Sequence, residues 1–189
     1  MSRQAPREAS VRTFVALPFA ETDLGRLATL MESLRRRVKG VRWTRPGGLH
    51  VTLRFLGASS ATAVESLGAL LRRETAEARP SSLRLSGLGI FPDRGNPRIL
   101  WLGVDLARPL LDLQRACEAA AQAVGFAPEP RPFVPHLTLG RWRNPARRPE
   151  LPPTDLGEVR VDRLVLFRSD QRRGGAVYTP LQIHTLGGA

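Results

Sequence analysis

The chain has 189 residues, of which 42% are hydrophobic and 24% are charged, as in ordinary soluble globular proteins. A chain of this length can bury roughly 70% of its unfolded surface, so a single domain needs no disulfide or metal to stabilise it. The formal net charge of +12 favours a polyanionic partner, nucleic acid above all. Nearly all of the positive charge is arginine, with Lys39 as the single lysine, so a GC-rich genome would explain the excess equally well.

The predicted elements begin with a strand over residues 11–17 and a helix that carries an apolar stripe. The stripe comprises Leu24, Leu27, Met31, Leu34 and Val38, and Gly40 ends it. A strand with the pattern H-x-T-L follows, starting at His50. Thr62 and Glu65 form a capping box for a helix over residues 63–78, and alternating apolar residues predict a strand over 82–91.

The second part of the chain predicts a similar series. A short strand over residues 99–104 precedes a helix that starts at Pro109 and stops at Gly125, with Leu110, Leu113, Cys117 and Val124 on one face. A second H-x-T-L strand, a Pro/Arg-rich loop over 144–155 and a late strand over 159–166 come next. The apolar pattern of the late strand shifts phase at Arg163, which we interpret as a bulge. Pro180 places the final strand, 177–183, at an edge or a bend.

The lone cysteine and the lack of long apolar segments narrow the cellular setting. Cys117 excludes an internal disulfide and a cysteine-based metal site, and its helical pattern predicts a buried thiol. The absence of disulfides fits a reducing compartment, so we expect a cytoplasmic protein. No stretch predicts a membrane span or a signal peptide. Residues 1–10 are expected to be a disordered basic lead-in, and residues 11–189 a single bilobal domain.

An internal repeat organises the domain, because His136 follows His50 by 86 residues in the same context. Residues 45–53 (RPGGLHVTL) and 131–139 (RPFVPHLTL) both read R-P-x-x-x-H-x-T-L. The match extends backwards without a gap; it pairs Leu24 with Leu110, Leu27 with Leu113, Met31 with Cys117, Val38 with Val124, Phe14 with Leu100 and Val15 with Trp101. The repeat predicts an α+β fold: two lobes of antiparallel sheet related by approximate two-fold symmetry, facing each other across a central cleft, with helices outside.

The two H-x-T patterns suit one kind of chemistry. Residues i and i+2 of a strand share a face about 6–7 Å apart, so His50 projects with Thr52, and His136 with Thr138. Phosphodiester displacement needs a base for the entering oxygen and an acid for the leaving oxygen, and two histidines can supply both near neutral pH. The threonine hydroxyls can donate to the nonbridging phosphate oxygens.

A single H-x-T pattern is more often structural than catalytic. With three histidines and 11 threonines, however, random placement gives about 0.17 such patterns in the chain, so two copies at one repeat offset indicate a site. The alternative is a duplication retained for folding alone. The third histidine, His184, has no partner in the repeat and is interpreted as structural.

Residues 50–57 (HVTLRFLG) and 135–141 (PHLTLGR) resemble the two signatures of the LigT-like two-histidine phosphoesterases. Within that superfamily the chain looks most like the bacterial and archaeal RNA 2′,3′-cyclic phosphodiesterases, formerly called 2′-5′ RNA ligases. The likeness starts near Val11 and covers nearly the whole chain. It includes residues 14–17 (FVAL), 96–103 (NPRILWLG), 164–169 (LVLFRS) and 178–179 (YT).

The resemblance implies hydrolysis of RNA 2′,3′-cyclic phosphate ends to a 2′-phosphate and a 3′-OH, without a cofactor. It implies catalytic roles for His50 and His136, with His50 as the acid and His136 as the base, although the symmetry permits the reverse. Phosphate contacts are implied for Thr52 and Thr138. The family's second motif also has an arginine five residues after its histidine, here Arg141. Strand parity puts Arg141 on the wrong face unless the chain bends at Gly140, where the family often has a small or apolar residue.

Three further side chains are candidates for substrate contacts. Arg54 shares the strand face of His50 by parity and could contribute charge, although a salt-bridged rim arginine is an alternative. Phe55 and Trp43 could stack on a base, and both could equally belong to the core. Trp101 is expected in the core.

Other functions remain open. A binding module of the same fold would hold an RNA end or nucleotide without turnover. A 2′-5′ RNA ligase would run the reaction in reverse, and a structural RNA-binding protein would leave the repeat unexplained. A metallophosphatase would need a cluster of Asp, Glu and His that the sequence lacks, so no metal is expected. The expected partner is RNA with a cyclic phosphate end, for example tRNA halves, or a small cyclic nucleotide, and the expected state is a monomer with no membrane partner.

Overall fold

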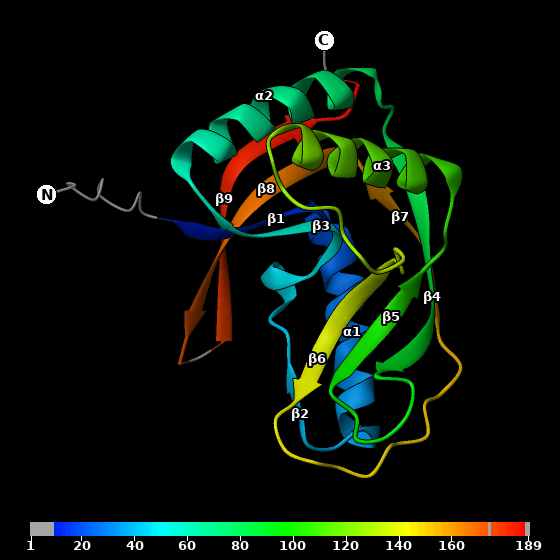
Figure 1. Ribbon diagram of the computed structural model, residues 1–189. Helices are drawn as coiled ribbons and strands as arrows, with labels where there is room; N and C mark the ends of the chain where they lie inside the picture. Colours follow the sequence, from blue (N-terminus) through cyan, green and yellow to red (C-terminus); the bar gives the residue numbers. More distant parts are fainter. Residues whose placement is uncertain (1–9, 174, 188–189) are drawn as a thin grey trace, which may run out of the picture.

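The computed structural model describes residues 10–173 and 175–187, so the predicted disorder of the lead-in lies outside the described residues except for Ser10. Figure 1 shows a curved sheet with three long helices packed around it. The elements in chain order are β1 (Val11–Pro18), α1 (Glu21–Arg37), β2 (Val41–Trp43), the short 3-10 helix η1 (Pro46–Gly48), β3 (His50–Ser59), α2 (Ala61–Glu77), β4 (Ser81–Phe91), β5 (Ile99–Val104), α3 (Arg108–Ala123), β6 (His136–Trp142), β7 (Asp155–Val161), β8 (Arg163–Arg172) and β9 (Gly175–Thr185).

The strands form one antiparallel sheet in the order β7-β4-β5-β6-β3-β1-β8-β9, with β2 added to β6. We call β3, β1, β8 and β9 the β3 half, and β7, β4, β5, β6 and β2 the β6 half. The halves join through the pairing of Val51 in β3 with Leu137 in β6. The predicted α+β fold is confirmed: each half holds one H-x-T strand, and the two H-x-T strands lie side by side where the halves meet.

The helix of each repeat packs against the half that contains the H-x-T strand of the other repeat. Helix α3 belongs to the second repeat and covers the β3 half, and helix α1 belongs to the first repeat and covers the β6 half. Helix α3 packs on β3, and α2 packs on α3 and β9 (Figure 1). Helix α1 instead lies on the β6 half, where Arg26 donates to the backbone carbonyl of Glu158 in β7 at 2.8 Å. This exchange buries the apolar stripe of each helix against a sheet that a different part of the chain has built, which couples the two halves.

The predicted stripes form the core. Leu27, Met31 and Leu34 of α1 are at most 2% exposed, and Leu110 and Cys117 of α3 are at most 1% exposed. Each such side chain of leucine size contributes about 1.5–3 kcal/mol through burial. Gly40 and Gly125, which follow the two helices, have φ of +73° and +94°, the left-handed conformation in which glycine ends a helix without strain. None of the described helices is long and apolar enough to cross a membrane.

Two local predictions are wrong. Helix α2 starts earlier than the Thr62–Glu65 capping box implied, because Ser60 is the N-cap and its hydroxyl accepts from Ala63 N at 3.1 Å. The predicted late strand is two strands. Strand β7 pairs with β4 at one end of the sheet, and β8 pairs with β1 in the other half, so the phase shift at Arg163 marks a crossing between the halves.

Other predictions for the end of the chain are confirmed. The Pro/Arg-rich segment is the loop between β6 and β7. Strand β9 is an edge strand, as Pro180 indicated, and its ladder with β8 skips a residue beside Pro180.

The repeat is not ungapped, because its first strands are displaced by one residue. Ala16 pairs with Thr52 in the first copy, and Trp101 pairs with Thr138 in the second. Trp101 therefore corresponds to Ala16, whereas the ungapped repeat assigned it to Val15. The first copy is one residue shorter than the second between its first strand and its helix. A loop lies there, and a loop can change in length without moving either element.

Candidate active site

Four polar side chains surround the pair of residues through which the two halves of the sheet are joined. Val51 and Leu137 pair there and are fully buried on the helix-covered side. Their neighbours, residues 50, 52, 136 and 138, must therefore point to the opposite side. Antiparallel register places His50 across from Thr138, and Thr52 across from His136. In an ideal antiparallel pair the two histidines would lie diagonally, with Cα atoms about 7–8 Å apart, which leaves room for a phosphate group between the rings.

The two imidazoles are held in the same way. His50 Nδ1 lies 2.9 Å from the carbonyl oxygen of Gly48, and His136 Nδ1 lies 2.8 Å from that of Val134. A carbonyl only accepts, so each Nδ1 carries the proton, and each Nε2 remains the free lone-pair atom of the neutral ring. Each acceptor precedes its histidine by two residues, so the repeated sequence reproduces the ring orientation as well as the strand.

Both threonine hydroxyls are available to a ligand. Thr52 and Thr138 are half-buried on the histidine side. The side-chain hydrogen bonds formed within residues 10–173 and 175–187 include neither hydroxyl. A ligand oxygen placed between the imidazoles would thus have two donors beside it.

A bulge follows each H-x-T pattern at the leucine. In the ladder of β1 with β3, Ala16 faces Thr52 and Val15 faces Arg54, so Leu53 is skipped. In the ladder of β5 with β6, Leu139 is skipped in the same way. A bulge reverses the alternation of side chains beyond it. Arg141 consequently points to the histidine side, where it is exposed. The bend that Arg141 required exists, one residue before Gly140.

Burial and charge favour the neutral imidazoles in the unliganded site. Burial lowers the pKa of His50 to about 4; the hydrogen bond to the Gly48 carbonyl opposes this, and the positive charges of His136 and Arg141 add to it. Burial also lowers the pKa of His136, against its bond to Val134, and Arg141 lowers it further. Arg141 thus acts on both rings, and its charge would be offset by an anion bound between them.

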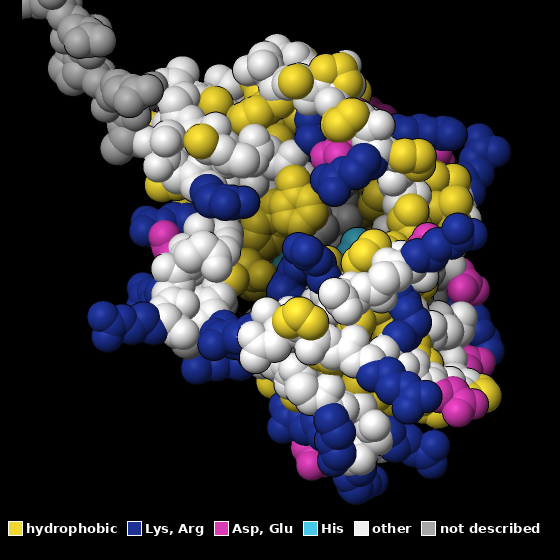
Figure 2. Space-filling model, turned by 60° about the horizontal axis from the view of Figure 1, so that its bottom comes forward, with side chains coloured by type: hydrophobic (Ala, Val, Ile, Leu, Met, Phe, Trp, Pro, Cys, Tyr) yellow, Lys and Arg dark blue, Asp and Glu magenta, His cyan; other side chains and the backbone are white. Residues whose placement is uncertain are grey.

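Figure 2 shows the site as a hollow with histidine at depth, a hydrophobic wall on one side and basic side chains around the rim. Among the described residues, no group of three or more His, Cys, Asp or Glu side chains is arranged to hold a metal ion. The hydrogen-bond donors in the hollow are the two threonine hydroxyls and the Arg141 guanidinium, which can bind an anion, while the neutral imidazoles present Nε2 as an acceptor.

Comparison with known proteins shows the family to which the chain belongs. The 2′-5′ RNA ligase superfamily matches residues 22–173. The chain belongs to this superfamily. It is 30% identical over 183 residues to an RNA 2′,3′-cyclic phosphodiesterase of Methanothermobacter thermautotrophicus, covering 93% of this chain and 99% of the relative. An RNA 2′,3′-cyclic phosphodiesterase of Thermus thermophilus is 34% identical over 160 residues, which cover 81% of this chain and 79% of the relative.

Solved structures of the superfamily share the fold. A crystal structure of a protein from Thermus thermophilus superposes with a TM-score of 0.83 at 32% identity, covering 94% of this chain and 98% of that one. The Escherichia coli LigT structure complexed with 3′-AMP has a TM-score of 0.81 at 26% identity, covering 95% of this chain and 100% of LigT.

Arg54 does not occupy the place that parity gave it. The bulge at Leu53 turns its side chain to the helix side, where it is 6% exposed and its Nε lies 2.6 Å from Glu118 of α3. It also donates to the carbonyls of Phe55 and Ala127. The expectation that Arg54 shares the face of His50 is wrong, and the salt-bridged alternative holds, in a buried setting instead of at the rim. Arg54 ties β3 to α3 and to the segment that leads to the second H-x-T strand.

Phe55 and Trp43, the two aromatic candidates for base stacking, differ in their position relative to the histidines. Phe55 stands on the histidine side and is 53% exposed, with its ring 6.0 Å from that of Phe14. Trp43 does not approach the histidines: it packs against the core, and the guanidinium of Arg35 in α1 lies 5.7 Å from its ring centroid. Stacking of Trp43 on a substrate base is therefore excluded by its position.

Several aromatic residues near the histidines were missed in the sequence. Tyr178 and Phe14 contact the His50 ring edge-on and tilted, with centroids 5.0 and 4.9 Å away. Phe91 contacts the His136 ring edge-on at 5.1 Å. Trp101, expected in the core, is half-buried on the cleft side, 6.3 Å from the His136 ring. The alternation Ile99, Trp101, Gly103 could have indicated this face, whereas the contact of Tyr178 depends on a distant edge strand.

Proposed function

We propose that the protein hydrolyses RNA 2′,3′-cyclic phosphate ends to a 2′-phosphate and a free 3′-OH. One imidazole Nε2 removes a proton from a water molecule, whose oxygen forms a new bond to phosphorus. The bond from phosphorus to O3′ breaks, and the other imidazole gives its Nε2 proton to O3′. Thr52, Thr138 and Arg141 contact the nonbridging oxygens, where negative charge increases in the transition state.

The matched orientation of the two imidazoles carries this proposal. Both rings donate Nδ1–H to the carbonyl two residues earlier, and both offer Nε2 to the same hollow. A fold that only bound an RNA end would not need two identically oriented acid–base groups; donors for the phosphate would suffice. The non-catalytic binding module is therefore the weaker candidate. The superfamily relatives named RNA 2′,3′-cyclic phosphodiesterase support the same substrate class.

The resemblance implies His50 as the acid and His136 as the base, and we propose the same order. Burial lowers the pKa of both imidazoles, and both rings are held in the same way through Nδ1. Because the two rings are so alike in the unliganded site, an experiment has to distinguish their roles.

A substrate with sulfur in place of the bridging 3′ oxygen tests the assignment. A thiolate leaves without a proton, so replacing the acid matters little with this substrate, whereas replacing the base still abolishes turnover. We expect the sulfur substrate to restore most of the activity lost in His50→Ala and little of that lost in His136→Ala. Restoration in His136→Ala instead would reverse the two roles.

The wider setting follows from the same reaction. Ligation to a 2′-5′ linkage is the reverse reaction. It competes with hydrolysis only when the RNA ends are concentrated, because water otherwise attacks the cyclic phosphate. We propose residues 11–189 as one catalytic domain acting as a cytoplasmic monomer, with RNA fragments such as tRNA halves as substrates.

The test of the function is incubation with an RNA oligomer that ends in a 2′,3′-cyclic phosphate, with EDTA present. We expect hydrolysis, with the product phosphate on the 2′ oxygen by phosphorus NMR or by resistance to a 3′-phosphate-specific phosphatase. An unchanged cyclic end would refute the proposal. Activity that EDTA abolishes and that Mg²⁺ or Mn²⁺ restores would refute the two-histidine mechanism.

A further inference from the structure

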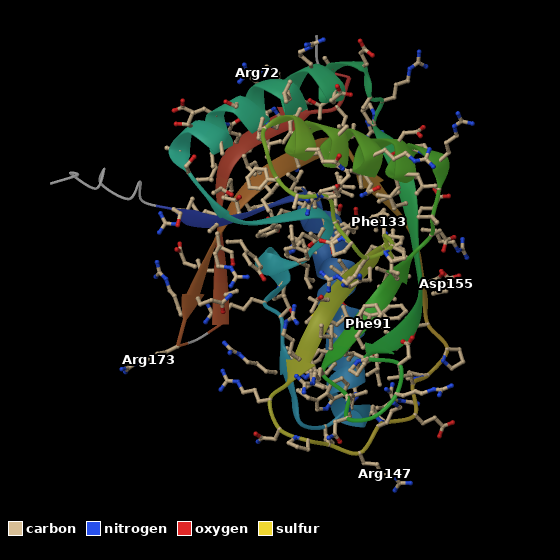
Figure 3. The ribbon with its side chains drawn as sticks, in the orientation of Figure 1. Arg72, Phe91, Phe133, Arg147, Asp155 and Arg173 are labelled. Carbon is tan, nitrogen blue, oxygen red and sulfur yellow. The ribbon has the colours of Figure 1, made fainter. Side chains whose placement is uncertain are left out.

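A basic groove lies at the end of β6 opposite to His136. Its volume is about 460 Å³, and it lies between the β2–β6 pair and the tip of the β8–β9 hairpin. Figure 3 shows Arg173 at that tip. The groove is lined by Gly40, Val41, Arg42, Arg143, Asn144 and Arg173. Three of these six residues are arginines and none is acidic. The ion pairs formed among the described residues include none of the three.

A second groove on the molecule has both arginines and carboxylates in its lining, so a lining without carboxylates is not a general property of this surface. It runs between the end of α2 and the start of α3 and is also lined by arginines, Arg79 and Arg108. There, however, the lining includes the carboxylates of Glu74, Glu77 and Asp112. An anion would meet repulsion as well as attraction in that groove. The general excess of arginine therefore does not by itself produce a surface free of carboxylates.

Arg42 links the basic groove to Arg141 of the candidate site. Arg42 in β2 pairs directly with Arg141 in β6, so the two side chains share the cleft face. Arg143 is the first residue after β6, and it lines the groove together with Arg42. The guanidinium of Arg42 in turn lies against Gly175 of the hairpin, where a side chain would collide with it. Positive groups thus lead stepwise from the histidines to the hairpin.

We propose that this groove binds the RNA strand on the 5′ side of the terminal nucleotide, with Arg42, Arg143 and Arg173 contacting its phosphates. The inference rests on the proposed function. A terminal nucleotide with a cyclic phosphate is joined to its RNA through its 5′ oxygen alone, so the strand must leave the hollow by one path. A path lined by arginines without carboxylates favours successive phosphates. The substrate class is therefore an oligoribonucleotide, since a cyclic mononucleotide has no upstream phosphate to bind.

The experiment compares two substrates that share the reacting group. One is cytidine 2′,3′-cyclic monophosphate, and the other is an eight-nucleotide RNA ending in the same cyclic cytidine. The test variant is Arg143→Gln with Arg173→Gln, and adding Arg42→Gln extends it. The control is Arg73→Gln with Arg79→Gln, which removes the same charge from the α2 region; Arg72 marks this helix on the opposite side of the molecule in Figure 3.

We expect the test variant to lower kcat/KM for the RNA about tenfold, since each exposed ion pair is worth roughly two- to fivefold. Its kcat/KM for the mononucleotide should stay within twofold of wild type. The slope of log affinity against log salt for the RNA should fall by about 1 to 2, because each lost contact with single-stranded nucleic acid removes about 0.7. The control variant should match wild type on both substrates.

Three outcomes overturn the inference while leaving the proposed function intact. These are no loss on the RNA, an equal loss on both substrates, and an equal loss in the control variant, which would show an effect of net charge alone. Failure of the proposed function looks different, because the wild-type protein would then hydrolyse neither substrate.

Discussion

The two copies of the H-x-T strand carry the same bulge and differ in the two residues that follow it. In the β3 half these are Arg54, buried in ion pairs, and Phe55, exposed on the cleft side; in the β6 half they are Gly140 and Arg141. Gly140 has no room for a side chain, because Val41 and the backbone of β2 lie against it. The copies therefore agree at the groups that would move protons and diverge beside them.

This divergence gives the two walls of the hollow different chemistry. Phe14, Phe55, Phe167 and Tyr178 gather around His50, and their ring centroids lie 5.1–6.0 Å from that of Phe14. Beside His136 stands the guanidinium of Arg141, whose charge reaches both imidazoles. A symmetric pair of histidines thus lies in an asymmetric cleft. The arginine side suits the phosphate and the aromatic side suits the rest of the substrate, so the substrate would bind in one orientation.

The largest expected effect tests the symmetric part. His50→Ala and His136→Ala should each lower turnover at least about 10²-fold, because a proton-transfer group typically contributes 10² to 10⁴-fold. The double variant should be little worse than either single variant, since the two groups act together. Single-turnover rates on the cyclic-phosphate RNA measure this. His184→Gln, a buried histidine outside the repeat, is the control and should retain turnover. A folded His136→Ala protein with near-normal turnover would contradict the mechanism.

The next effect concerns Arg54 and should appear in stability. Glu118→Gln leaves a buried guanidinium without its closest carboxylate, and breaking such a pair costs about 3–5 kcal/mol when both groups are fully buried. Glu118 is 18% exposed, so we expect about 2–3 kcal/mol from urea unfolding. Glu129→Gln is the matched control: its carboxylate lies 3.6 Å away and is more exposed, so it should cost under about 1 kcal/mol. Equal losses would show that Arg54 has no preferred partner.

Arg141→Gln should weaken the reaction about tenfold to hundredfold and also shift its pH dependence. The wild-type kcat/KM should be bell-shaped on the acidic side of neutrality. It falls at low pH, where the base gains a proton, and at higher pH, where the acid loses its proton. The pKa of both imidazoles is lowered, that of His50 to about 4. Arg141 lowers both values, so its removal should move both limbs to higher pH.

A matched variant separates this local effect from a change of overall charge. Arg147→Gln removes one positive charge from the loop between β6 and β7, at the far end of the molecule in Figure 3. It should leave both limbs in place, and limbs that stayed in place in Arg141→Gln as well would show that the guanidinium does not act on the imidazoles.

The sequence predicted the pair of histidines, the threonines and the α+β fold because the repeat kept their spacing. It could not predict the bulges at Leu53 and Leu139, since a bulge depends on the partner strand and leaves no signal in the alternation itself. Each bulge reverses which residues face the cleft beyond it. Strand parity therefore predicts Arg54 on the cleft face, whereas its side chain points to the helix side, and it predicts Arg141 away from the cleft, whereas its side chain points to the histidine side. The environments of Trp43 and Tyr178 could not be predicted for a related reason, because their neighbours come from α1 for Trp43 and from β1 and β3 for Tyr178.

The smallest expected effect concerns the aromatic wall. Phe55 is 53% exposed and stands where the other copy has Arg141, so it is positioned to stack on the terminal base. Base–aromatic stacking is worth about 1–3 kcal/mol, and a ring at the rim should lie near the lower limit, so Phe55→Ala should raise KM roughly fivefold with little change in kcat. A base-free five-membered cyclic phosphate, turned over by the same histidines, should show no difference between the variant and wild type. An equal rise in KM for both substrates would mean that Phe55 supports the His50 wall through Phe14 instead of contacting the base. The two repeats would then differ in packing alone at this position, and recognition of the base would have to come from the side of Trp101 and Phe91.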